Sequence, residues 1–127
     1  MIKVYGLEDR LNPIKHEMSD VLQACMNGVL GLPKDKRAHR FFPMKRDDFF
    51  YPAGRSDAYT VIEINMIAGR SKQTQKRLIM AIFSAFEKTL GIANIDVEIT
   101  IAEQPAHCWG FRGITGDDAA LNYKINV

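Results

Sequence analysis

Alternating apolar and polar residues predict strands at residues 59–67 (YTVIEINMI) and 97–103 (VEITIAE). Between them, a helical spacing of apolar side chains predicts a helix. Its stripe occupies positions 78, 82, 85, 86, 89 and 90. Ser71 is a favoured N-cap for this helix, and Gly91 is a favoured C-terminal stop. Together these residues predict a β-α-β unit.

The first forty residues follow the same order. Residues 2–5 alternate between apolar and polar, which predicts a strand at the start of the chain. Asn12 followed by Pro13 is typical of a helix start, with the cap at Asn12 and proline at the first helical position. The apolar stripe of this helix ends at Gly31, and residues 39–43 (HRFFP) are the candidate strand that closes the unit.

Shifting the chain by 60 residues aligns the two units without gaps. Ile2 then aligns with Ile62, and Arg10 aligns with Arg70. A repeat of this length indicates one supersecondary unit used twice, each copy burying an apolar sheet face that it could not bury alone. Because the crossover within a β-α-β unit is right-handed, the two strands of each unit are predicted to be parallel.

The predicted fold class is therefore α+β, a tandem β-α-β repeat forming a four-stranded sheet with two helices on one face. A single domain is expected over residues 1–127, with pseudo-repeats at 1–60 and 61–120. Residues 121–127 (LNYKINV) alternate again and predict an added C-terminal strand, which could cross to a neighbouring subunit. The sheet face without helices needs cover, and other subunits are the expected source.

Composition and charge narrow the function classes without choosing one. The chain is 46% hydrophobic and 25% charged, and its net charge of +2 is too small to indicate a polyanionic partner. No apolar run approaches the ~20 residues that cross a bilayer, and the first residues lack a secretory signal pattern. Two cysteines, Cys25 and Cys108, are too few for a disulfide framework or a cysteine metal cluster. We therefore expect a cytoplasmic domain without a membrane segment, a metal or a cofactor.

One stretch, residues 34–52, combines basic and aromatic side chains as a nucleic-acid surface would. Six lysines and arginines lie between Lys34 and Arg46, interleaved with Phe41 and Phe42. Three aspartates within the stretch dilute this charge. A solvated loop followed by a buried strand explains the same pattern, so nucleic acid is not the expected partner.

Three short motifs follow the predicted strands. Residues 68–71 (AGRS) form a strand-to-helix turn, and residues 7–10 (LEDR) form the same turn in the first unit. Residues 103–113 (EQPAHCWGFRG) follow the last strand of the repeat and place an aromatic residue before a glycine. With the doubled β-α-β unit, these motifs resemble the plan of the tautomerase superfamily, which includes 4-oxalocrotonate tautomerase and malonate semialdehyde decarboxylase. The resemblance covers essentially the whole chain.

The resemblance implies chemistry at the amino terminus. Members of that superfamily use an amino-terminal proline as base or acid on a carbonyl acid, while arginines hold the substrate carboxylate. This chain departs from the pattern, because residue 2 is isoleucine and no proline stands at the start. A gapless count back from Arg10 places the proline one position before Met1. A one-residue slip in the turn would instead bring the Met1 α-amine to that place, where burial or a nearby cation would lower its pKa from about 8.

The resemblance and the residues together give the candidate binding residues. A cation is disfavoured at a helix N-terminus, so Arg70 is explained either as a solvated side chain or as an anion-binding group beside the helix amides. Arg10 holds the matching place in the first unit, and Arg40 is a candidate second carboxylate holder. Trp109 and Phe111 are expected either in the core or, as the resemblance implies, in the wall of the site.

Two function hypotheses follow. The first is a homotrimeric tautomerase-superfamily protein that binds a small carboxylate or a keto or enol acid, with weak or altered tautomerase (isomerase) activity. The alternative is a non-catalytic ligand-binding or interaction protein that keeps the fold after losing the catalytic base. Nucleophilic chemistry at His107 and Cys108 is not expected, because no third orienting group has the right context.

Overall fold

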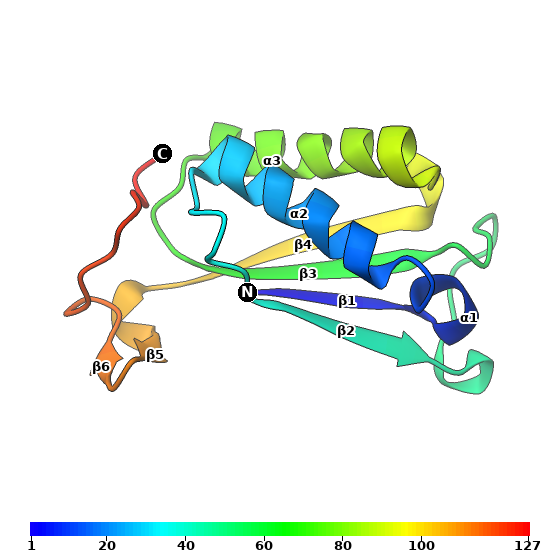
Figure 1. Ribbon diagram of the computed structural model, residues 1–127, viewed down its shortest axis with the longest axis horizontal. Coiled ribbons are helices and arrows are strands. Elements are labelled where there is room, and N and C mark those ends of the chain that lie inside the picture. The colour runs from blue at the N-terminus through cyan, green and yellow to red at the C-terminus, as the bar shows by residue number, and fades with distance from the viewer.

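In the computed structural model, which describes residues 1–127, four strands form one sheet and two long helices lie on one of its faces (Figure 1). The sheet strands are β1 (Ile2–Leu7), β2 (His39–Met44), β3 (Thr60–Ile67) and β4 (Val97–Gln104). The helices are the one-turn α1 (Glu8–Leu11) and the longer α2 (Lys15–Leu30) and α3 (Lys72–Ala85). A two-stranded hairpin, β5 (Gly110–Phe111) and β6 (Ile114–Thr115), follows the sheet. None of the helices combines the length and apolarity that crossing a bilayer requires.

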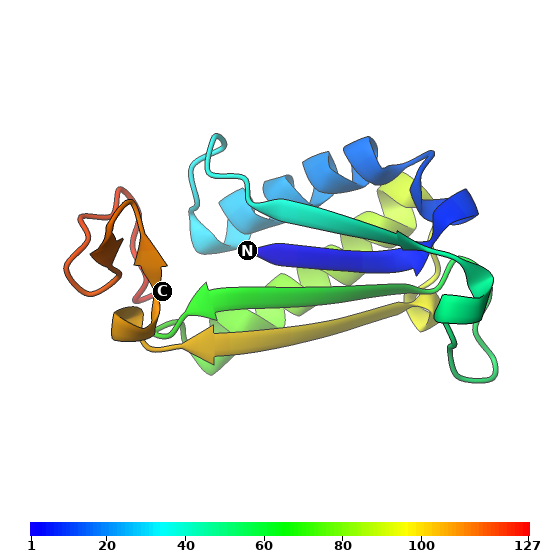
Figure 2. The same cartoon turned by 90° about the horizontal axis from the view of Figure 1, so that it is seen from below.

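The sheet has the order β2-β1-β3-β4, with the two repeats meeting at its centre (Figure 2). β1 is parallel to β2 and β3 is parallel to β4, whereas β1 and β3 are antiparallel. Ile2 pairs with His39 and Ile62 pairs with Ile99, the same separation of 37 residues in each unit. The predicted fold class is confirmed. The division at residues 60 and 61 remains a prediction, which this matching register supports.

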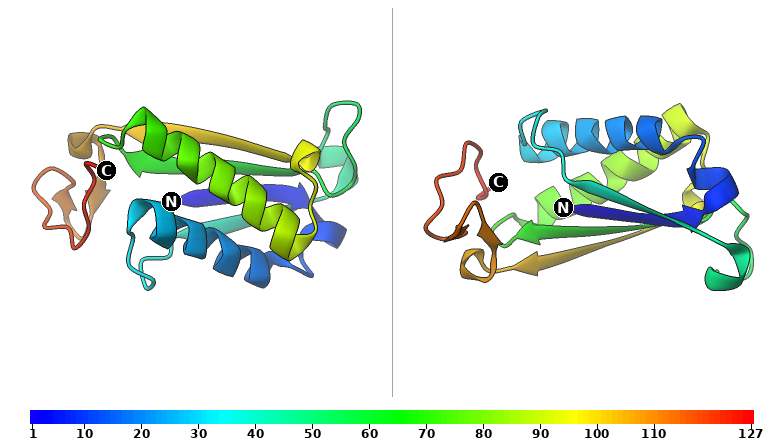
Figure 3. Two further views of the ribbon diagram at one scale, coloured as in Figure 1. Left: turned by 90° about the horizontal axis from the view of Figure 1, so that it is seen from above. Right: turned by 60° about the horizontal axis from the view of Figure 1, so that its bottom comes forward.

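The core lies between the sheet and the two long helices, which cross the same sheet face (Figure 3). Alternation places every second side chain of β1 and β3 against the helices, where it is buried. The sheet residues at the centre of this core are Ile2, Val4, Ile62 and Ile64, and the helix residues packed against them are Met18, Leu22, Leu78, Ile82 and Phe86. The opposite sheet face has no helix over it, as the pattern predicted.

The predicted start of the first long helix is wrong by two residues. Residues 8–11 form the separate helix α1, and the N–H of Asn12 donates to Glu8 O, so Asn12 ends that turn instead of capping the next helix. α2 begins at Lys15 after Ile14. Leu11 is buried, which anchors the extra turn to the core. The other limits agree with the sequence: Gly31 and Gly91 both end helical segments at positive φ, and the Ser71 side chain accepts a hydrogen bond from the Thr74 N–H.

The strand predicted over residues 121–127 does not form within the chain. This segment is irregular and returns to the beginning of α3, where Val127 O accepts hydrogen bonds from the hydroxyls of Ser71 and Thr74. Figure 3 shows it closing the end of the molecule beside the start of α3. Its alternation therefore serves contacts with a turn and a helix rather than with a sheet edge. Pairing with a neighbouring subunit stays a prediction.

Candidate functional site

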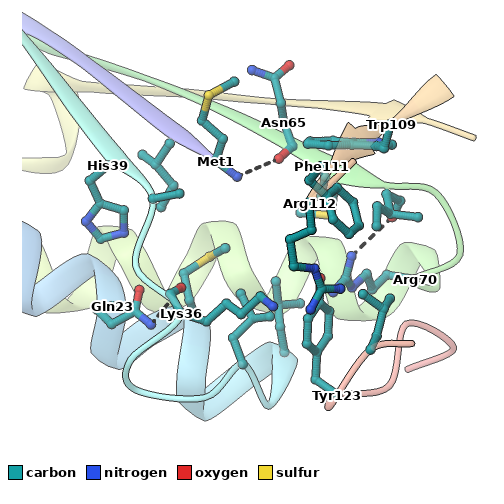
Figure 4. A pocket seen from close by; sticks show the side chains of 18 residues that line it. Met1, Gln23, Lys36, His39, Asn65, Arg70, Trp109, Phe111, Arg112 and Tyr123 are labelled. Carbon is teal, nitrogen blue, oxygen red and sulfur yellow. Dashed lines mark hydrogen bonds between the residues drawn. The ribbon is translucent and has the colours of Figure 1, made fainter. Parts of the chain in front are cut away.

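A cavity of about 340 Å³ opens at the end of the sheet where β1 begins and β3 ends (Figure 4). Its walls come from these strands, from the end of α2 and the loop before β2, and from the segment after β4. Three cationic side chains line it, Lys36, Arg70 and Arg112, and no acidic side chain does. No group of three or more His, Cys, Asp or Glu side chains in the chain is placed to hold a metal. The cavity is therefore suited to an organic anion.

The Met1 amino group is held at the edge of this cavity by Asn65. Its nitrogen donates to Asn65 O at 2.9 Å, and the Asn65 N–H donates to Met1 O at 2.8 Å. These bonds extend the β1–β3 ladder by one pair, so the position of the amine is set by the sheet. Burial lowers the pKa of the Met1 amine from its ordinary value of 8.0, and the charges of Arg40 and Arg70 lower it further.

Arg70 is placed by the turn between β3 and α3. Gly69 adopts a φ of +144°, and a Cβ there would lie 2.6 Å from the Ile125 side chain, so this turn suits glycine alone. The Arg70 side chain is 7% exposed, and its Nη1 donates to Ile67 O at 3.1 Å.

The opposite edge of that guanidinium is unused. Nε is buried without a partner, and Nη2 makes no hydrogen bond within the chain. Nε–H and Nη2–H together form the fork that binds a carboxylate in bidentate fashion. Burial lowers the pKa of Arg70, while Tyr123 and Glu103 oppose that shift. The buried Arg70 guanidinium therefore keeps two hydrogen-bond donors that no group of the chain uses.

Trp109 and Phe111 form the aromatic wall of the cavity. Trp109 is anchored through its backbone, since its N–H donates to Ala106 O and its O accepts from the Gly116 N–H. A Cβ on Gly116 would lie 2.5 Å from Ala106 O, so only glycine permits this close packing. The indole Nε1–H of Trp109 is buried without a hydrogen-bond partner.

Four of the predicted site residues thus line one cavity: Met1, Arg70, Trp109 and Phe111. Arg10 does not join them, because β1 and β3 are antiparallel and their following turns lie at opposite ends of the sheet. Arg10 instead lines a second cavity, of about 170 Å³, at that far end. Arg40 pairs in register with Lys3 on the face without helices and does not line either cavity, although its charge reaches the Met1 amine.

Sequence reasoning missed Lys36, Arg112 and Tyr123. The ring of Tyr123 lies between two cations, with Lys36 Nζ at 5.5 Å and Arg70 Cζ at 6.0 Å from its centroid. Arg112 sits at φ +55° in the hairpin turn between β5 and β6, and its Nη2 donates to Ala120 O. All three residues belong to loops or to the C-terminal segment, where the hydrophobic pattern does not indicate which way a side chain points.

His39 also lines the cavity and was expected only as a strand residue. Its Nδ1 lies 2.8 Å from Ser19 Oγ, which itself accepts from Arg37 Nη1. Ser19 Oγ thus joins the His39 ring and the Arg37 guanidinium in one hydrogen-bonded group. Burial, followed by the charges of Arg37 and the amino terminus, lowers the pKa of His39 from 6.5 to about 4. The alternation of β2 could have placed His39 on the same face as Ile2.

The model of a family described as "Tautomerase enzyme" matches residues 36–112. The chain belongs to this tautomerase family. The match spans more than half of the chain and includes Arg70, Trp109 and Phe111, three of the residues around the cavity.

Solved structures of related proteins share the fold of this tautomerase-family chain. FG41 malonate semialdehyde decarboxylase inhibited by 3-bromopropiolate is 27% identical with a TM-score of 0.78, covering 87% of this chain and 88% of its own. A wild-type fused 4-OT described as an asymmetric trimer is 19% identical, with a TM-score of 0.80 and coverages of 91% and 95%. A member of the cis-3-chloroacrylic acid dehalogenase family is 17% identical, with a TM-score of 0.79 and coverages of 90% and 81%.

Proposed function

We propose that this tautomerase-family protein binds a small keto or enol carboxylic acid in the cavity and interconverts its keto and enol forms. One observation carries the proposal: the free fork of Arg70 and the Met1 amine of lowered pKa line the same cavity. The fork supplies a carboxylate site. The amine supplies a base whose unprotonated fraction near neutral pH is larger than that of an exposed amine.

The roles follow from the unused hydrogen-bonding groups. The substrate carboxylate binds the Nε–H and Nη2–H of Arg70. The lone pair of the Met1 nitrogen takes the proton from the carbon next to the carbonyl; the C–H bond breaks and its electron pair forms the enolate. The Trp109 Nε1–H donates to the enolate oxygen, and the proton held by the amine is then returned to that oxygen. Hydrogen bonds to a developing oxyanion are worth most when the donors are fixed and shielded from water, as these are.

The related solved structures support a carboxylate ligand. The malonate semialdehyde decarboxylase, at 27% identity, is inhibited by 3-bromopropiolate, which is itself a small carboxylate. Lys36 and Arg112 add positive charge at the cavity without any acidic neighbour in its lining, which favours an anion in the same way.

A keto–enol assay with phenylenolpyruvate tests the proposal. Arg70→Ala is expected to lower kcat/KM by roughly a hundredfold, as removal of one fixed charged donor typically does. Arg77→Ala is the matched control, because Arg77 is an exposed arginine on α3 away from the cavity and its loss is expected to change nothing. Equal rates for wild type and Arg70→Ala would remove Arg70 from the mechanism.

The second candidate is carboxylate binding without turnover. It is favoured by the positions of Arg10 and Arg40, since neither lines the cavity with Arg70 within the chain. A processed variant that begins Pro-Ile-Lys separates the two functions. A gain of tautomerase activity over an inactive parent would indicate that the pocket is intact and the base was lost, whereas binding with no gain would indicate a remodelled pocket.

We also infer that the chain assembles as a homotrimer, in line with the description of the fused 4-OT as a trimer. The sheet face without helices carries half-exposed Tyr5 stacked on Phe42, with ring centroids 5.0 Å apart. Arg40 lies on the same face. Covering this face would bury aromatic surface and bring Arg40 into the protein interior beside the site.

A further inference from the structure

The cavity is larger and more apolar than a carboxylate head group requires. Twelve of its eighteen lining residues are hydrophobic. Met26 and Leu30 from the end of α2 contribute to one wall with Leu32, and Leu121 contributes from the C-terminal segment. A volume of about 340 Å³ corresponds to roughly eleven waters at ~30 Å³ each, about twice what a three-carbon acid would fill.

Among the residues that line the cavity, the fully buried side-chain nitrogen and oxygen atoms without a hydrogen-bond partner belong to Arg70 and Trp109. The Gln23 amide donates to Pro33 O at 3.1 Å and to Lys36 O at 3.3 Å, and His39 Nδ1 is paired with Ser19. Figure 4 shows Gln23 and His39 on one side of the cavity, with Arg70 and Trp109 on the other. Buried hydrogen-bonding capacity without a partner is therefore confined to the side of Arg70 and Trp109.

The remaining cations do not make a second buried anion site. Lys36 and Arg112 are both exposed. Lys36 faces the Tyr123 ring, and Arg112 is engaged with Ala120 O and lies over the Phe111 ring. A second carboxylate deep in the cavity would therefore lose its hydration without gaining a partner, and the cost of that burial is high.

From this division we propose that the ligand is a monocarboxylic acid with an apolar body of about six to eight carbons, a size estimated from the cavity volume. The acid head binds Arg70 and Trp109, and the body lies against Met26, Leu30 and Leu32. This inference rests on the proposed function and names the substrate class of the same site. It separates this chain from a binder of three-carbon acids and from a binder of dicarboxylates.

Trp109 is the only tryptophan and lines the cavity, so its fluorescence reports binding directly. The full chain is titrated with butanoate, hexanoate and octanoate, and with hexanedioate as the dicarboxylate of matched length. Kd is expected to fall by up to about fourfold for each added methylene that is buried. Hexanoate is expected to bind at least tenfold more tightly than hexanedioate.

Two variants test whether the apolar wall of the cavity causes the dependence of Kd on the chain length of the acid. Leu32 and Leu121 are half-buried, so Leu32→Gln and Leu121→Gln are compatible with folding. Each is expected to weaken octanoate binding fivefold or more while changing butanoate binding less than twofold. Ile95→Gln, at a residue 58% exposed and outside the cavity, is the control and is expected to change neither.

The possible outcomes separate a failure of this inference from a failure of the proposed function on which it rests. Equal Kd values for butanoate and octanoate, or tighter binding of hexanedioate than hexanoate, would overturn the apolar body and leave the carboxylate site standing. If none of the acids binds, and wild type and Arg70→Ala show the same fluorescence throughout the titration, the proposed function itself would be overturned.

Discussion

Met1 and Asn65 exchange two backbone hydrogen bonds, from the Met1 amino group to Asn65 O at 2.9 Å and from the Asn65 N–H to Met1 O at 2.8 Å. A chain terminus usually frays, but here it completes the central antiparallel ladder of the sheet. The amine is consequently fixed relative to Arg70, which follows β3 by three residues. The proposed base and the proposed carboxylate-binding residue are thus connected through one pair of strands.

The pH dependence of turnover follows from the lowered pKa of the Met1 amine. If the unprotonated amine is the base, kcat/KM rises with pH through a midpoint below 8.0, the ordinary value. Arg40→Gln removes a cation that lowers this pKa, so it is expected to shift the midpoint toward higher pH. Rate profiles from pH 5 to 10 measure the shift. Arg77→Gln, at an exposed residue of α3, serves as the control. If the midpoint is the same in wild type and Arg40→Gln, the amine would be excluded as the titrating base.

His39 links stability to acid pH. Its pKa is about 4 in the folded chain and 6.5 when unperturbed, so between these values the unfolded chain binds more protons. Stability is therefore expected to be fully present above pH 6.5 and to fall as the pH drops toward 4. His39→Gln, which keeps a hydrogen-bond partner for Ser19 Oγ, is expected to flatten this part of the profile.

Urea unfolding at pH 4.5, 5.5 and 7.0 measures the acid effect. The exposed His16 provides the comparison, because His16→Gln removes a histidine without touching the Ser19 contact. Two profiles of the same steepness for wild type and His39→Gln would show that other groups cause the acid loss.

Much of the fold was predictable because each buried position of a strand requires an apolar side chain, which leaves a regular pattern in the sequence. Ile2, Val4, Ile62 and Ile64 alternate in the sequence because each must face α2 and α3, and this alternation located β1 and β3. The C-terminal segment alternates for another reason. Its odd positions contact the Arg70 turn, as Tyr123 and Ile125 do, and periodicity cannot distinguish such contacts from a strand.

The site was predictable only in part. Arg70 and Trp109 stand in local motifs whose chemistry is visible in the sequence. The position of the Met1 amine at the cavity depends instead on the register between β1 and β3. A shift of this register by one residue would move the amino terminus by roughly 3.3 Å. Lys36 and Arg112 reach the cavity from loops, whose direction is set by packing that no local pattern records.

Gly69 tests whether the C-terminal segment depends on the Arg70 turn. A Cβ at this residue would lie 2.6 Å from Ile125 Cγ2, and its φ of +144° is strained for any other residue. Gly69→Ala is expected to destabilise the fold by about 1–3 kcal/mol and to release residues 119–127. Hydrogen exchange of that segment and urea unfolding measure the two effects. Gly28→Ala is the matched control, since nothing lies within 4 Å of a Cβ there and α2 gains about 0.5–1 kcal/mol from the change. Unchanged exchange in Gly69→Ala would mean that the segment is held elsewhere.

Assembly is tested on the sheet face without helices. Phe42 is 41% exposed there and stacks on Tyr5, so in a trimer it is expected to lie in an interface. Light scattering after size exclusion is expected to give three times the 14.4 kDa chain mass for wild type and a smaller species for Phe42→Asp, because a carboxylate buried without a partner costs several kcal/mol. Phe50→Asp is the control: Phe50 is 87% exposed on a loop outside the sheet, and the same charge there should leave the mass unchanged. If Phe42→Asp still forms a trimer, the interface must lie on another surface. Assembly would then not bury Arg40 beside the cavity.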